Sequence, residues 1–104
     1  MIHLTSENFE GEVINSIMPV AVDFWASWCG PCRMLAPVFE SLDSEYASKV
    51  KLCKVNIDEQ GALAVQYGVV SIPTVIVFKG GKEVQRIVGV KSEDEYADVF
   101  DSLI

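Results

Sequence analysis

Two cysteines, Cys29 and Cys32, stand three positions apart in the segment WASWCGPC. Thiols at this spacing can form a structural disulfide, supply half of a metal site, or act as a redox pair. The chain has a third cysteine, Cys53, so the three cannot all pair within one molecule. The polar and acidic N-terminus does not resemble a signal peptide, and a structural disulfide would serve poorly in the reducing compartment that we therefore expect.

A metal-binding module is the alternative from another class. Zinc commonly takes four ligands from two closely spaced pairs. Here the ligands would be one Cys-x-x-Cys pair, the separate Cys53 and the single histidine, His3. We expect His3 to be a solvated residue near the N-terminus and Cys53 to be a small buried hydrophobe.

The position of Cys29, between a predicted strand and a predicted helix, favours redox chemistry. Its sulfur would lie near unpaired backbone N–H groups and the positive end of the helix dipole, which stabilise a thiolate. Helical geometry would place the two Cα atoms roughly 5 Å apart, a distance that suits a disulfide. Pro31 fixes its own φ, so the loop between the thiols should be stiff in both redox states.

Two charged residues are predicted in the strands beside this pair. Asp23 interrupts the apolar segment PVAVDFWA. A buried carboxyl group tends to be protonated and can relay a proton to a nearby thiol, whereas a strand end that reaches solvent would be the ordinary alternative. Lys54 is best explained by a partner such as Asp23, although a lysine that extends to solvent is the simpler interpretation. If Lys54 faces Asp23, Cys53 points away from the cysteine pair.

The elements that must position these residues alternate between helix and strand. The patterns predict a helix over 6–16, a buried strand over 19–26, a helix after the cysteine pair and a strand over 50–58. Strand, helix and strand in this order form a right-handed unit with parallel strands. Pro37 lies inside the second helix, where we expect it to kink the axis, with a helix boundary as the alternative.

The C-terminal half is predicted to add a hairpin and a last helix. A short helix over 59–67 comes first, and the segments TVIVF and EVQRIV then flank KGGK, a pattern typical of an antiparallel hairpin. Ser92 and Glu95 form a capping-box pattern at the start of the last helix. The sequence therefore predicts one α/β domain over residues 1–104, with a mixed sheet between helices on both faces.

The composition restricts the partners. The chain has 8 Lys+Arg and 15 Asp+Glu, a formal net charge of -7, which disfavours binding to nucleic acid or to anionic membranes. No apolar segment approaches the roughly 20 residues of a membrane-spanning helix. We therefore expect a cytoplasmic protein with neither nucleic acid nor membrane as a partner.

The chain resembles the thioredoxin family over essentially its whole length. The motif WCGPC between a strand and a helix carries this resemblance, together with Asp23, Phe24-Trp25-Ala26, Pro37, Lys54, Ile72-Pro73-Thr74, Gly81 and Gly89. The resemblance implies the thioredoxin fold and a protein disulfide reductase that acts through a mixed disulfide with its client proteins. It also implies no cofactor in the chain itself and regeneration by an NADPH-linked flavoprotein thioredoxin reductase.

The same resemblance implies roles for individual residues. Cys29 would be the attacking thiol and Cys32 the buried resolving thiol, with Asp23 as proton relay, tuned by Lys54. Pro73 would follow a cis peptide bond, and the backbone of Ile72 would pair with the client as an added strand. An apolar docking rim would comprise Trp28, Gly30, Pro31, Ile72, Pro73, Val88, Gly89 and Val90.

Two segments depart from the family pattern, and they bear on partner preference. Ser27 stands at a position that varies in the family, and the residues Val-Val-Ser at 69–71 are more apolar than expected. A disulfide oxidase or isomerase is the nearest alternative function, but oxidising relatives usually carry a histidine between the thiols, where this chain has Gly30 and Pro31. A missing cysteine would favour a purely structural binding module, but Cys29 and Cys32 are both present.

Overall fold

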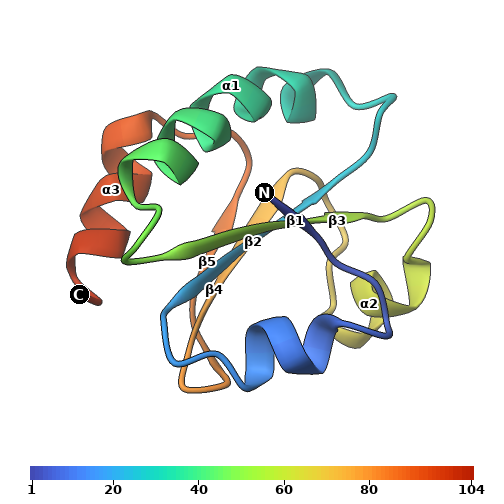
Figure 1. Cartoon of the computed structure of the whole chain (residues 1–104). Helices are drawn as coiled ribbons and strands as arrows, with labels where there is room; N and C mark the ends of the chain where they lie inside the picture. Colours follow the sequence, from blue (N-terminus) through green and yellow to red (C-terminus); the bar gives the residue numbers. More distant parts are fainter.

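The centre of the molecule is a five-stranded mixed sheet, seen in a computed structural model that describes all of residues 1–104 (Figure 1). The strands are β1 (Ile2–His3), β2 (Val20–Trp25), β3 (Lys51–Asn56), β4 (Thr74–Lys79) and β5 (Lys82–Val88). Their order in the sheet is β1-β3-β2-β4-β5. Strand β3 is parallel to both β1 and β2, whereas β4 is antiparallel to β2 and to β5. The predicted mixed sheet, its parallel β2–β3 pair and the β4–β5 hairpin are therefore confirmed.

Helices cover both faces of this sheet, as predicted (Figure 1). Helices α1 (Gly30–Glu45) and α3 (Glu93–Asp101) lie on one face, and α2 (Gly61–Gln66) lies on the other with η1 (Glu10–Ile14), a short π-helical segment. None of the helices combines the length and the apolar character that a transmembrane span requires.

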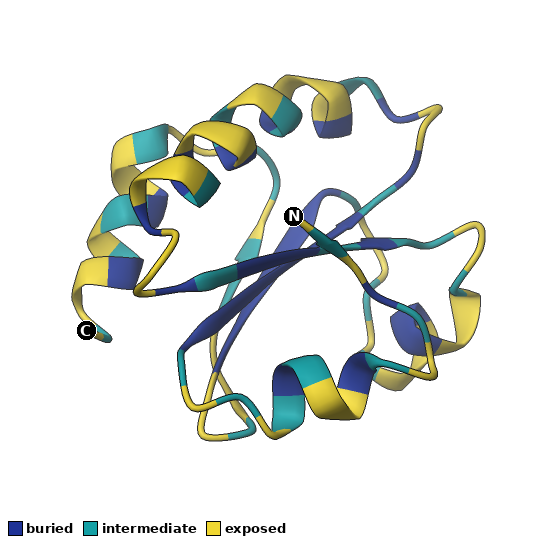
Figure 2. Cartoon of the chain, viewed as in Figure 1, coloured by how far each residue is buried: buried dark blue, intermediate teal, exposed yellow.

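The alternation of side chains along the strands divides most of the core into two large clusters. In β2, Val22 and Phe24 join the cluster under η1 and α2, whereas Ala21 joins the cluster under α1 and α3. Asp23 shares the orientation of Ala21, so its carboxyl group lies on the α1 side of the sheet. The inner strands β2, β3 and β4 and the inner sides of the helices hold the buried residues (Figure 2). The edge strands β1 and β5 contain no buried residue, and most of β5 is exposed, as are the outer sides of the helices and the turns.

The N-terminal region differs from its prediction. Strand β1 was not predicted, because a segment of two residues carries no periodic pattern; it exists through its pairing with β3. The helix expected over 6–16 is shorter, and the N–H of Asn15 donates to the carbonyl oxygen of Glu10 at 2.9 Å, a π-type bond. Helix α1 continues through Pro37, so a helix boundary at that proline is wrong, and the kink remains a prediction.

Two local motifs fix the C-terminal half. Gly80 and Gly81 both have positive φ at the tip of the hairpin, and a Cβ atom at Gly81 would lie 2.9 Å from the carbonyl oxygen of Ile14. The Ser92 Oγ caps α3 by accepting the N–H of Glu95 at 3.2 Å. A full capping box would also have the Glu95 carboxylate accept the backbone N–H of Ser92. That part of the prediction is wrong, since the carboxylate accepts the Ser92 hydroxyl at 3.4 Å instead.

Candidate functional site

The cysteine pair lies where β2 leads into α1. Cys29 is the N-cap of α1, and Gly30 and Pro31 begin the helix. A disulfide joins Cys29 to Cys32, and their Cα atoms are 5.2 Å apart, which agrees with the distance predicted from helical geometry. The local sequence thus produces a disulfide within the first turn of a helix.

The two sulfur atoms have different electrostatic surroundings. The Sγ of Cys29 accepts the backbone N–H of Cys32 at 3.2 Å, one of the donors that the first turn leaves unpaired. This donor and the positive end of the helix dipole would both stabilise a thiolate on Cys29 once the disulfide is reduced. Burial does not separate the two residues, because Cys29 is 5% exposed and Cys32 is 3% exposed.

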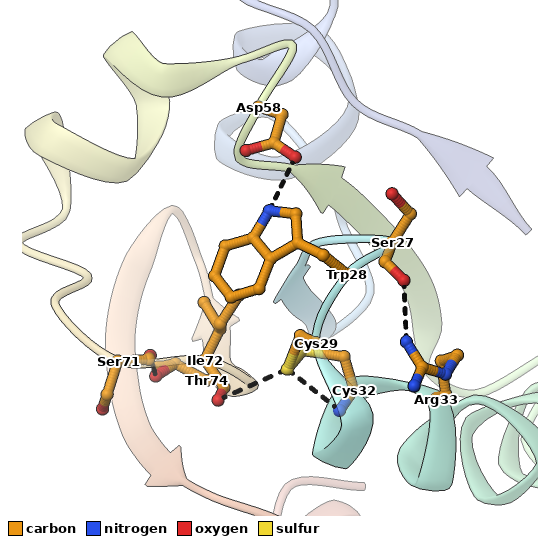
Figure 3. Close-up of a disulfide and its surroundings, with 9 residues drawn as sticks. All are labelled: Ser27, Trp28, Cys29, Cys32, Arg33, Asp58, Ser71, Ile72 and Thr74. Carbon is orange, nitrogen blue, oxygen red and sulfur yellow. Dashed lines mark hydrogen bonds between the residues drawn. A yellow bond between two sulfur atoms is a disulfide. The ribbon is translucent and has the colours of Figure 1, made fainter.

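The segment just before β4, which contains Ile72, lies against the Cys29 side of the disulfide (Figure 3). The Ile72 carbonyl oxygen lies 3.8 Å from the Sγ of Cys29, and the Ile72–Pro73 peptide bond is cis, as the resemblance implies. The Thr74 hydroxyl, which is buried, donates to the carbonyl oxygen of Ser71 at 2.6 Å. This bond ties the 71–74 turn together beside the cysteines.

Trp28 forms the exposed part of the site. Its side chain is 66% exposed, and the indole N–H donates to Asp58 Oδ2 at 3.0 Å (Figure 3). The sequence motifs assign no role to Asp58. Its position just after β3, next to the end of β2, is nevertheless a signal that it lies near Trp28. On the other side of the cysteines, Arg33 donates to the carbonyl oxygen of Ser27 at 2.9 Å. Both bonds restrain the loop that precedes Cys29.

Asp23 is a buried carboxyl group without a hydrogen-bond partner in the protein. The residue is 0% exposed, and neither carboxylate oxygen has a partner. Burial raises the pKa of Asp23 to about 7, and the charge of Lys54 opposes part of that rise. A group with this pKa can both accept and release a proton near neutral pH.

Lys54 occupies the register position beside Asp23, as expected, but its ammonium group does not pair with that carboxylate. The Nζ atom lies 5.0 Å from the centre of the Trp25 ring, a cation–π contact, and forms no ion pair with Asp23. Lys54 is therefore a partner of Asp23 through its charge and its place in the sheet, and not through an ion pair. Lys54 as a whole residue is half-buried.

Cys53 lies on the other face of the sheet, as predicted from strand alternation. It is 0% exposed and belongs to the cluster under η1 and α2, whereas the disulfide belongs to a separate small cluster with Ala26. Burial raises the pKa of the Cys53 thiol to about 12. A thiol in this environment is a poor nucleophile at neutral pH.

The residues expected to form the docking rim are brought together, but unequally exposed. Trp28, Pro31 and Val88 are exposed, Gly30, Ile72, Gly89 and Val90 are half-buried, and Pro73 is buried. Val88 pairs with Thr74 in the β4–β5 ladder, and the N–H of Gly89 donates to the Pro73 carbonyl oxygen at 2.8 Å. The 88–90 segment is thereby attached to the turn that contacts Cys29, and Pro73 supports the rim from below.

The surface around the disulfide contains no pocket. The hollows of the molecule lie between η1 and α2, beside His3 and Lys54, and between β5 and α3, where Val88 contributes to the wall. No group of three or more His, Cys, Asp or Glu side chains is placed so that it could hold a metal ion. A disulfide that lies just beneath a surface without a pocket suits a macromolecular substrate better than a small one.

Comparisons of the sequence with known proteins relate this chain to one family. The family model described as Thioredoxin matches residues 1–102. The chain is 52% identical over 86 residues to "Thioredoxin 1" of Nostoc sp., which covers 83% of this chain and 80% of that protein. It is 47% identical over 98 residues to "Thioredoxin 1" of Synechococcus elongatus, covering 94% and 92%, and 42% identical over 104 residues to "Thioredoxin" of Haemophilus influenzae, covering 100% and 97%.

Proposed function

We infer the roles of the site residues from the premise that this chain belongs to the thioredoxin family and is a protein disulfide oxidoreductase. The observation that carries the proposal is the Cys29–Cys32 disulfide at the N-terminus of α1, just beneath a surface that has no pocket. One domain over residues 1–104 would carry the whole activity. It reduces disulfides in client proteins, and Cys29 and Cys32 supply the electrons.

The reaction has two exchange steps. In the first, the Cys29 thiolate attacks a client disulfide, so that a mixed disulfide forms and one client sulfur leaves as a thiolate. In the second, the Cys32 thiolate attacks the Cys29 sulfur, which restores the Cys29–Cys32 disulfide and releases the second client sulfur. Two electrons pass from the dithiol to the client. The N–H of Cys32, which contacts the Cys29 Sγ, supports the choice of Cys29 as attacker.

We propose that Asp23 accepts the proton that Cys32 must lose before the second step. Its buried, unpaired carboxylate and its pKa of about 7 suit this role at neutral pH. The positive charge of Lys54 keeps that pKa lower than burial alone would make it. Lys54 is therefore a tuning residue whose charge acts through Asp23.

The docking rim comprises Trp28, Gly30, Pro31, Ile72, Pro73, Val88, Gly89 and Val90. The exposed indole of Trp28 and the side chain of Val88 would contact the client on two sides of the disulfide. The Ile72 backbone, 3.8 Å from the Cys29 Sγ, would pair with the client chain. The residues Val-Val-Ser at 69–71 make the neighbouring loop more apolar, which would favour apolar client segments.

Family membership implies client proteins with disulfides and a reductase partner in general. We propose specifically an NADPH-linked flavoprotein thioredoxin reductase, so that the chain carries electrons from this enzyme to its clients. A cytoplasmic location is proposed with it, because a reducing dithiol is useful where disulfides are kept reduced.

Reduction of insulin by the protein with dithiothreitol tests the activity, and a trapping experiment tests the roles. Reduced Cys32→Ser should form a stable mixed disulfide with insulin through Cys29. This adduct should be visible on a non-reducing gel and should be cleaved by dithiothreitol. The matched control is Cys29→Ser, which also retains Cys53 and so reports any adduct through that thiol. Equal adduct formation by Cys29→Ser that persists when Cys53 is also replaced by alanine would show that attacker and resolver are wrongly assigned.

A further inference from the structure

The hydroxyl group of Tyr96 is the feature that the proposed chemistry does not use. Tyr96 lies in α3, remote in sequence from the cysteines, and is 0% exposed. Its ring fills the cluster under α1 and α3, where phenylalanine or leucine would pack as well. A buried phenol needs partners for its polar atom, so those partners indicate what the hydroxyl does.

Both partners lie in the loop that joins β5 to α3. The Tyr96 hydroxyl donates to the carbonyl oxygen of Gly89 at 3.2 Å and accepts the N–H of Lys91 at 3.2 Å. Burial raises the pKa of Tyr96, so the phenol stays neutral and can make both bonds at physiological pH. One side chain thus holds the peptide groups on both sides of Val90.

The loop so held is part of the docking rim. Gly89 has a φ of 86°, and its N–H donates to the Pro73 carbonyl oxygen at 2.8 Å. Pro73 follows Ile72, whose carbonyl oxygen lies 3.8 Å from the Cys29 Sγ. A continuous series of contacts therefore runs from the Tyr96 hydroxyl through Gly89 and Pro73 to the turn beside the disulfide.

We propose that Tyr96 is a positioning residue for client recognition: its hydroxyl holds the Gly89–Lys91 backbone so that the Val88–Val90 part of the rim is preformed. A preformed rim lowers the entropy cost of docking a protein segment. Small disulfides do not need the rim, so their reaction with Cys29 is independent of this hydroxyl. This inference rests on the proposed function.

Tyr96→Phe tests the inference, since it removes the hydroxyl and keeps the ring. The second-order rate constant for insulin reduction should fall by about fivefold, within the range that the loss of hydrogen bonds can produce. The rate constant for hydroxyethyl disulfide, a small substrate, should stay within about 1.5-fold, because the chemistry at Cys29 is unchanged. Amide hydrogen exchange at Gly89 and Lys91 should become faster.

Tyr46→Phe is the matched control for lost stability. The Tyr46 hydroxyl is also partly buried and donates to Asp101 Oδ1 at 2.7 Å, but this contact joins the end of α1 to α3, away from the rim. All rates are measured where circular dichroism shows every variant to be fully folded. The control should lose stability and keep the parent rate with both substrates.

Three outcomes decide the question. A fall in the insulin rate alone, with faster exchange at Gly89 and Lys91, supports the positioning role. An unchanged insulin rate in Tyr96→Phe, or equal falls with insulin and hydroxyethyl disulfide, overturns it while the parent still reduces insulin. If the parent itself does not reduce insulin, the proposed function fails, and the inference fails with it.

Discussion

Replacing Asp23 with asparagine should stabilise the folded protein at neutral and alkaline pH. The change keeps the size of the side chain but removes a charge that lies fully buried, with no hydrogen-bond partner at either oxygen. The amide introduced by the substitution would be buried without partners too, as is the protonated acid, so the difference between the proteins is mainly the cost of ionisation.

The structure gives both the size and the sign of this effect. Burial raises the pKa of Asp23 from 3.8 to about 7 in the folded state. That rise corresponds to about 4 kcal/mol of lost stability once the carboxyl group is ionised in both states. Between these two pKa values the folded state holds a proton that the unfolded state has released, so stability falls as pH rises toward 7. Well below pH 3.8 both states are protonated and the cost disappears.

Urea denaturation of the oxidised parent and of Asp23→Asn, across pH 4 to pH 8, measures this difference. The variant should gain about 3 to 4 kcal/mol at pH 8, and the gain should shrink toward zero near pH 4. Asp98→Asn, the same change at an exposed position of α3, should show no comparable trend. A gain that is constant over this pH range, or a loss of stability at pH 8, would refute the account of Asp23 as an ionisable group raised by burial.

The same variant tests the proton relay. With no carboxylate to accept the Cys32 proton, Asp23→Asn should resolve mixed disulfides about 10²-fold more slowly, the lower end of the range that general-base catalysis contributes. Insulin reduction, which this step limits only in part, should be about tenfold slower. An Asp23→Asn protein that is less stable and equally fast would make Asp23 an ordinary strand residue.

Two further predictions concern residues outside the reacting groups. Cys53→Ala should leave the rate of insulin reduction within about twofold of the parent rate. In the parent, the Cys53 thiol should resist alkylation at pH 8, because burial raises its pKa to about 12 and shields it from the reagent. Rapid labelling of Cys53 in the folded protein would contradict this. Gly81→Ala should destabilise the fold by about 1–3 kcal/mol in urea denaturation, because its Cβ would meet the Ile14 carbonyl oxygen at 2.9 Å. Gly80→Ala is the control, since Gly80 also has positive φ but faces open space, and it should cost about 1 kcal/mol. Equal losses of stability in the two variants would show that the contact with Ile14 does not matter.

Local patterns in the sequence were sufficient for much of the fold. The three- and four-residue spacing of apolar positions predicts α1, the Gly-Gly pair predicts the β4–β5 hairpin, and strand alternation separates Cys53 from the disulfide. These features depend on neighbours within a few residues, so their physical causes are visible in the sequence.

Features that depend on how distant segments meet were not predictable in the same way. Strand β1 forms only because β3 offers an edge for pairing. Whether the Lys54 ammonium group contacts the Asp23 carboxylate or the Trp25 ring depends on the relative placement of two strands and on side-chain rotamers. Tyr96 lies on the buried face of α3, but a helical pattern of apolar residues gives no information about the partners of its hydroxyl.

The short sequence separation of the disulfide means that its reduction hardly affects the stability of the fold. The bond joins residues only three positions apart, so opening it releases a very small loop and adds little freedom to an unfolded chain. The two large apolar clusters that hold the sheet to its helices contain neither Cys29 nor Cys32. The scaffold should therefore remain folded through successive rounds of oxidation and reduction, which allows one molecule to be used again for client after client.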